Sequence, residues 1–144
     1  MIGDELLDGR VTDTNSVYFA RGLQEVGLPL MQRTTVRDDL DDITREARAT
    51  IARGTELCLV SGGLGPTTDD ITAEAMAQLA AVDLVRDAAQ VARIEERLMR
   101  LGRTVTDNQR RQADRPRGAT LMRNARGTAP GFELHHQGCR FVCM

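Results

Sequence analysis

The sequence predicts an α/β protein, a three-layer α/β/α sandwich with a mostly parallel sheet. Between residues 13 and 101, amphipathic helical patterns alternate with short apolar runs, the order that parallel strands and crossover helices require. The run Leu57–Val60 is continuously apolar, as expected of a strand buried on both faces. No repeat or low-complexity linker divides the 144 residues. We therefore expect a single domain, residues 1–144.

The first elements are indicated by the spacing of apolar residues and by the glycines that end the helices. Apolar residues at helical spacing predict a helix from Val17 to Val26, which Gly27 ends. The segment Leu28–Val36 is expected to be a strand. A second amphipathic helix, Leu40–Ile51, begins after acidic residues that suit its positive end, and Gly54 stops it.

The second half continues the same rhythm. Residues 73–79 and 87–101 read as helices, the latter with an apolar stripe and a charged outer face. Residues 103–118 are polar and rich in arginine, which fits either a water-exposed helix or a cationic rim for a phosphate. After the turn 127–131, two short strands are expected around residues 132–134 and 140–144.

Composition restricts the partners. With 19 Lys+Arg, all of them arginine, against 21 acids, the net charge of −2 gives no general attraction to nucleic acid or anionic membrane. Trp is absent, and three Phe and one Tyr offer no stacking platform for single strands. No apolar run approaches a membrane span and no signal peptide is recognisable. We expect a cytoplasmic protein that binds neither nucleic acid nor membrane.

Cysteine and histidine offer little chemistry. The three cysteines lack the spacing of a metal site, and Cys139 and Cys143 share one face of an expected strand, as small core residues do. The two histidines, His135 and His136, are adjacent. A histidine-based metal site or a Ser-His-Asp triad is therefore not expected.

A glycine-rich turn, Ser61–Thr72, joins the apolar run to a helix and ends in two carboxylates, Asp69 and Asp70. Glycines allow sharp turns that bring backbone N–H groups against an anion, and a helix start adds further donors. The turn therefore predicts a phosphate site with Asp69 and Asp70 beside it. In the alternative interpretation the turn is a plain strand-to-helix connection and the two aspartates cap the helix.

Two common phosphate loops do not match this turn. A Walker loop ends in Gly-Lys-Ser/Thr, and the chain contains no lysine. A dinucleotide-binding loop needs a glycine three residues after its second one, where Thr68 stands here, and Pro66 would stiffen the turn.

Four segments together resemble the MoaB/Mog molybdopterin-binding family, and within it the amino-terminal domain of CinA-type competence/damage-inducible proteins. They are Gly3–Leu7 with the nearby Thr14-Asn15, Val36–Asp39, the Gly-Gly-x-Gly-Pro-x-x-Asp-Asp-x-Thr turn at 62–72, and Gly-Thr-Ala-Pro-Gly at 127–131. The Pro-Thr-Thr-Asp-Asp stretch after the glycines favours the CinA branch over the Mog branch.

The resemblance implies a pocket at the carboxyl ends of the strands. In it Asp38 and Asp70 would be catalytic, and Asp69 with Asp70 would hold a divalent metal, Mg²⁺ or Co²⁺. The residues expected to bind nucleotide or molybdopterin are Asp4, Glu5, Ser61, Gly62, Gly63, Leu64, Gly65, Pro66, Thr67, Gly127 and Thr128. A homo-oligomer, dimer or trimer, is also implied.

The family pattern further implies a chain truncated at both ends, with a longer strand before Gly3 and a Pro-Gly loop after Met144. Three functions stay open. The first is metal-dependent hydrolysis of an ADP-ribose-type pyrophosphate. The others are adenylyl transfer to molybdopterin in molybdenum cofactor biosynthesis and a non-catalytic module that binds pterin or nucleotide.

Overall fold

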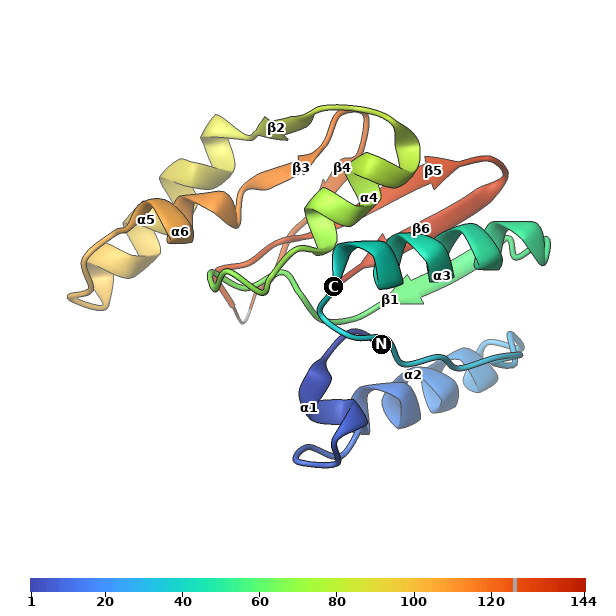
Figure 1. Cartoon of the computed structure of the whole chain (residues 1–144). Helices are drawn as coiled ribbons and strands as arrows, with labels where there is room; N and C mark the ends of the chain where they lie inside the picture. Colours follow the sequence, from blue (N-terminus) through green and yellow to red (C-terminus); the bar gives the residue numbers. More distant parts are fainter. Residues whose placement is uncertain (126) are drawn as a thin grey trace.

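The computed structural model describes residues 1–125 and 127–144, and its centre is a four-stranded sheet (Figure 1). The strands are β1 (Leu57–Val60), β4 (Thr120–Met122), β5 (Gly131–His136) and β6 (Cys139–Cys143), in the order β1-β6-β5-β4. β1 runs parallel to β6, and the other pairs are antiparallel. A parallel bridge between Ile2 and Val36 adds a further pairing. The predicted α/β fold is confirmed, with a mixed sheet.

Helices flank this sheet. In Figure 1, α3 (Leu40–Ala52) and α4 (Thr72–Ala80) lie together over the strands, while α1 (Asp4–Leu7) and α2 (Thr14–Glu25) lie beneath β1. Asp39 caps α3 by accepting hydrogen bonds from the N–H groups of Asp41 and Asp42. The main core lies between α3, α4 and the sheet, and its largest fully buried side chains include Phe132, Phe141 and Met76.

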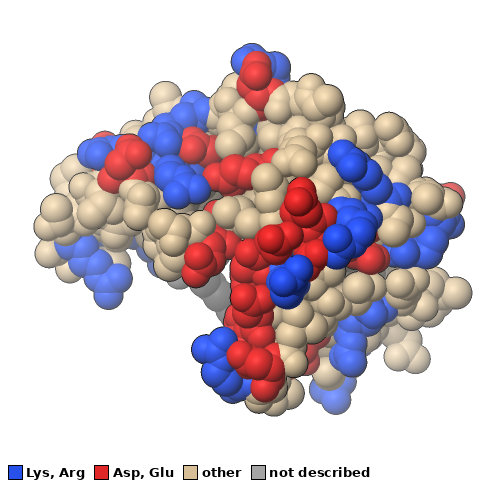
Figure 2. Space-filling view, in the orientation of Figure 1, with Lys and Arg blue, Asp and Glu red and all other residues tan. Residues whose placement is uncertain are grey.

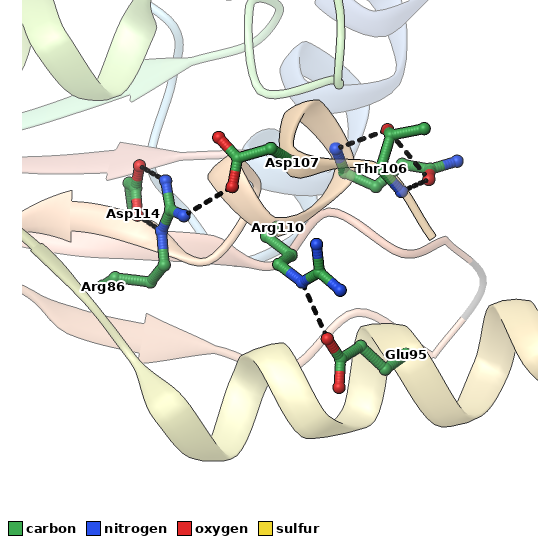
Figure 3. A network of polar contacts seen from close by, with 7 residues as sticks. Arg86, Glu95, Thr106, Asp107, Arg110 and Asp114 are labelled. Carbon is green, nitrogen blue, oxygen red and sulfur yellow. Dashed lines mark hydrogen bonds and ion pairs between the residues drawn. The ribbon is translucent and has the colours of Figure 1, made fainter. Parts of the chain in front are cut away.

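A projecting arm extends from this body. It consists of β2 (Leu84–Arg86), α5 (Ala88–Arg100), α6 (Asp107–Arg111) and β3 (Asp114–Pro116), with β2 and β3 paired antiparallel. Ile94, Leu98 and Ala113 form a small core of their own. Figure 3 shows the polar contacts that fix it: Arg86 bridges Asp114 and Asp107, and Arg110 donates to Glu95 at 2.8 Å.

Most predicted helices and strands are confirmed. The helices near 17–26, 40–51, 73–79 and 87–101 form α2 to α5, and the strands at 132–134 and 140–144 form β5 and β6. The prediction of a strand at Leu28–Val36 is wrong: only Val36 pairs, through Ile2, and the rest is irregular. Residues 103–118 contain α6 and β3 rather than one exposed helix. Cys139 and Cys143 are buried, as predicted.

A cavity of about 670 Å³ lies beside β1 between α2 and α3. Its walls are mainly apolar and include Phe19, Leu23, Ala47 and Leu59. β1 is an edge strand, because only β6 pairs with it in the sheet. On its other side, the one backbone contact among the described residues comes just after the strand, where the Ser61 carbonyl accepts a hydrogen bond from the N–H of Ile2. Leu57 is consequently exposed, although a continuously apolar strand is expected to be buried.

None of the helices in the described parts of the chain has both the length and the apolar character needed to span a bilayer.

Candidate functional site

Three chain segments leave the sheet side by side at one edge. The N–H of Ile2 donates to Ser61 O at 2.9 Å, and the N–H of Gly3 donates to Val36 O at 3.1 Å. Ile2, Val36 and β1 therefore end next to one another, and the loops that follow carry Asp4, Asp38 and the glycine turn. The carboxyl ends of parallel strands are where open α/β sheets bind ligands. The sequence prediction that these segments meet is thus matched by the geometry.

Two glycines let the turn pack against its neighbours. Gly62 has φ 113°, and a Cβ there would lie 2.3 Å from Ile2 O. Gly63 has φ 66°, and a Cβ there would lie 2.3 Å from the hydroxyl oxygen of Thr72. That hydroxyl donates to Gly62 O at 2.8 Å, and the N–H of Thr72 donates to Gly63 O at 3.0 Å. Thr72, fully buried at the start of α4, therefore fixes the shape of the turn.

The turn presents backbone donors. The N–H of Gly62 is used, because it donates to Met144 O at 3.3 Å. The next three N–H groups, those of Gly63, Leu64 and Gly65, have no acceptor among the described residues. Consecutive free N–H groups in a tight turn form a concave site for an anion. The glycine turn retains the donors that a phosphate site needs.

The carboxylate of Asp70 is hydrogen-bonded within the turn. Its carboxylate accepts from the N–H of Thr67 at 2.7 Å and from the Thr67 hydroxyl at 2.6 Å, and a Cβ on Gly65 would lie 2.5 Å from it. Neither Asp69 nor Asp70 caps α4, whose N-cap is Ile71 without a side-chain hydrogen bond. The capping interpretation is therefore wrong for both aspartates. Pro66 and Asp69 are exposed on the same turn.

Four carboxylates gather at this edge. Asp38 Oδ2 accepts from the backbone N–H of Asp4 at 3.0 Å. Burial raises the pKa of Asp38 above its ordinary value, and the negative charges of Glu5, Asp4 and Asp69 raise it further, against the lowering effect of that hydrogen bond. Figure 2 shows acidic side chains running along α1 toward the start of α3. Asp38 is thus a carboxylate whose charge is destabilised by its surroundings.

The carboxylates expected to bind a metal ion would have to share it with a substrate that supplies further oxygen ligands. Within residues 1–125 and 127–144, no three His, Cys, Asp or Glu side chains form a group that could hold a metal ion. Carboxylate oxygens suit Mg²⁺, which proteins often bind through one or two carboxylates together with substrate phosphates and water. The donor types at Asp38 and Asp69 fit such a shared site, whereas Asp70 is occupied by Thr67.

The projecting arm closes one side of the turn. α6 and α4 are joined by an ion pair between Arg111 and Glu74 at 2.8 Å. The hollow left between the glycine turn and α6 is only about 20 Å³, roughly the space of one water. Arg110 and Arg111 of α6 are therefore both partnered, and a ligand would reach the turn from the side of Asp38 and Asp69.

Two residues of the predicted set lie elsewhere, and one contributor was not predicted. Gly127 and Thr128 line a different hollow, against α5, while Pro130 borders the glycine turn. Asn15, at the start of α2, donates to the Ser61 hydroxyl at 3.1 Å. Nothing in the local pattern predicts that contact, because the two residues are 46 positions apart and meet only through the fold.

Known proteins agree with this architecture. The family model described as "Probable molybdopterin binding domain" matches residues 1–144. A CinA-like protein of Anaeromyxobacter dehalogenans is 42% identical over 99% of this chain and 35% of its own length. A putative competence-damage inducible protein of Oceanobacillus iheyensis is 35% identical over 99% of the chain and 34% of its own. The chain thus spans about a third of these relatives.

Solved structures show the same relationship. The crystal structure of CinA from Thermoplasma acidophilum, described as of unknown function, superposes with a TM-score of 0.87 at 31% identity, covering 99% of this chain and 83% of that one. The molybdopterin biosynthesis enzyme MoaB of Thermus thermophilus gives 0.64 at 19% identity, covering 99% and 76%, and shares the fold. The chain belongs to the family of probable molybdopterin-binding domains and, within it, is a CinA-like domain.

Proposed function

We propose that this domain binds a nucleotide pyrophosphate of the ADP-ribose type and hydrolyses it with the help of a divalent metal. The observation that carries the proposal is the run of free N–H groups at Gly63, Leu64 and Gly65 beside the carboxylates of Asp38 and Asp69. Donors for phosphate oxygens and a carboxylate able to take a proton are the two requirements of phosphoryl transfer to water.

Each residue has a definable task. The three N–H groups would hold one phosphate, and the shape of the turn that aims them depends on Thr72 and Asp70. Asp38 would accept a proton from the attacking water as the new P–O bond forms and the bond to the leaving phosphate breaks, releasing AMP. Its raised pKa favours that role, because a carboxylate that is poorly stabilised as an anion is a stronger base.

A divalent ion, when bound by Asp38, Asp69 and the substrate phosphates, would neutralise charge on the pyrophosphate. Asp4 and Glu5 lie close enough to add to the negative charge around Asp38. We propose Mg²⁺ or Co²⁺ for this position, and we propose that the domain works as a dimer or trimer.

The test compares Asp38→Asn with the wild-type chain. ADP-ribose is incubated with each protein with and without Mg²⁺ or Co²⁺, and AMP is quantified. The amide keeps an oxygen for the Asp4 N–H but cannot take a proton, so kcat should fall about 100-fold or more while binding persists. Asp83→Asn on the exposed arm is the matched control. Equal turnover by Asp38→Asn and wild type contradicts the proposal.

A second candidate is adenylyl transfer to molybdopterin. It is favoured by the fold shared with proteins whose titles describe molybdopterin biosynthesis, among them MoaB of Thermus thermophilus. It predicts AMP joined to the pterin when ATP and molybdopterin are supplied together. The Leu64-Gly65-Pro66 stretch resembles the CinA branch rather than the Mog branch, which places the hydrolase first. If ADP-ribose and ATP bind without any turnover, the domain is the non-catalytic module.

A further inference from the structure

We infer that the hollow between α5 and residues 123–125 and 127–128 is a second anion site, which takes a compact doubly or triply charged group such as pyrophosphate. The hollow has a volume of about 510 Å³. It is separate from the glycine turn and contains none of the acidic residues assigned to the proposed catalytic site.

The lining is strongly positive in a protein of net charge −2. Four arginines line the hollow, against a single glutamate among the described lining residues, Glu96. Arg93, Arg97 and Arg100 are spaced by four and three positions on α5, so they project from one side of the helix. Arg123 approaches from the other wall, just after β4.

Three of these arginines, Arg93, Arg100 and Arg123, are poorly neutralised. Glu96 pairs with Arg100 at 3.1 Å, but both side chains are largely exposed and the pair is weak in water. Arg93 and Arg123 are exposed and have no ion-pair partner in the described parts of the chain. Elsewhere in the arm, Arg86, Arg110 and Arg111 each have an acidic partner. Unpaired cations facing one another across a hollow repel until an anion enters.

The walls are already in place. Arg97 donates through Nη1 to Gly127 O at 3.1 Å, which ties the loop to α5. Asn124 accepts from the N–H of Gly127 at 2.9 Å and donates to Ala129 O at 2.9 Å, which orders the loop internally. Because α5 is also packed through Ile94 and Leu98, the helix wall is held in place before a ligand arrives.

A simpler explanation accounts for part of the pattern. Arg97 and Arg100 lie in the last turn of α5, where positive side chains complement the negative end of the helix dipole. Arg93 lies a turn earlier, and Arg123 belongs to another segment, so the dipole explains neither. Arginine guanidinium groups match phosphate oxygens in pairs of parallel hydrogen bonds. A compact phosphate group is therefore the expected occupant.

The experiment titrates the folded chain with inorganic pyrophosphate, without divalent metal, and follows the assigned backbone amides by ¹⁵N–¹H NMR. Saturable shifts are expected at residues 93–101, 123–125 and 127–128. Arg93→Gln/Arg123→Gln should weaken this binding about 100-fold, since each lost charge-assisted contact costs about tenfold. Arg21→Gln/Arg48→Gln removes the same charge from exposed positions on α2 and α3 and should leave binding unchanged.

Three results would overturn the inference. Shifts confined to residues 61–70 would mean that the glycine turn alone binds the anion. Equal weakening by the two double variants would mean a general charge effect. Absence of saturable shifts at millimolar pyrophosphate from a folded protein would mean that the hollow does not bind this group. The first and third results also report on phosphate binding at the glycine turn, whereas the hydrolysis proposal is tested separately, by release of AMP from ADP-ribose with Asp38→Asn.

Discussion

Replacing Thr72 by Val tests how the glycine turn is held. Valine keeps the branched shape but removes the hydroxyl that donates to Gly62 O at 2.8 Å from a fully buried position. A buried carbonyl that loses its partner costs about 1–3 kcal/mol. For a chain of this size, that loss lowers the melting temperature by ~3–10 °C. Chemical denaturation followed by circular dichroism measures the free energy of unfolding directly.

Thr44→Val is the matched control. Thr44, on α3, is also buried, but its hydroxyl has no hydrogen-bond partner within residues 1–125 and 127–144. Removing an unsatisfied buried hydroxyl is expected to be neutral or stabilising. The same substitution should therefore have opposite effects at the two positions. If Thr72→Val costs no more than Thr44→Val, the hydroxyl does not hold the turn, and the proposed preorganisation of the Gly63–Gly65 donors is refuted.

Three further predictions concern charge. Because the folded pKa of Asp38 is raised, its ionisation opposes folding; Asp38→Asn should stabilise the fold at pH 7, and the gain should vanish as pH falls below the ordinary value. Hydrogen bonds from two arginines lower the pKa of Asp42, so Asp42→Asn should destabilise at pH 7 but not once Asp42 is protonated in both states, as urea unfolding across pH checks. The half-exposed ion pair between Glu74 and Arg111 should show a coupling free energy of about 0.5–1 kcal/mol in a double-mutant cycle that replaces each residue by Gln. A coupling free energy near zero would mean that this ion pair does not hold α6 against α4.

The elements that the sequence predicts well are those with their own local signals. Periodic apolar residues and caps such as Asp39 and Asp87 identify α3 and α5 within a residue or two. Gln137 and Gly138, with φ 47° and 80°, form the turn that joins β5 to β6. Three-residue strands such as β2 carry no comparable pattern, because their pairing with β3 is decided by packing of the arm.

Leu28–Val36 shows two reasons why an expected strand does not form. Strand-favouring residues are found only at its end, at Thr34, Thr35 and Val36, and Pro29 cannot donate a ladder hydrogen bond. A strand also forms only where a neighbour offers hydrogen bonds. Val36 has that neighbour in Met1 and Ile2, and Thr34 O accepts from the Met1 ammonium group at 2.8 Å. Leu30 and Met31 have none and stay exposed beside the large cavity.

The candidate site, too, is predicted by the sequence only in part. The positions of the glycine turn and Asp38 were predictable, because each follows a segment that reads as a strand and parallel strands end at a common edge. The position of Asp4 was expected only from the family resemblance. The roles of the residues within the site were not predictable. Asp70 turns back to Thr67, and Asp38 gains its raised pKa from burial and from three other carboxylates, which only the folded chain brings together.

In this domain the large cavity beside β1 and the groups suited to bind a phosphate lie in different places. The 670 Å³ cavity is mainly apolar and borders the unpaired side of β1, where peptide groups and leucine side chains would suit an added strand rather than a phosphate. The glycine turn borders only about 20 Å³ of enclosed space, yet it offers three N–H groups without an acceptor among the described residues and carries Asp69, whose charge acts on Asp38. A pyrophosphate needs donors and charge compensation more than enclosure, because its oxygens gain most from directed N–H groups and cations. The residues around Gly63–Gly65 and Asp38 therefore outweigh the larger volume as the place where a nucleotide would be bound.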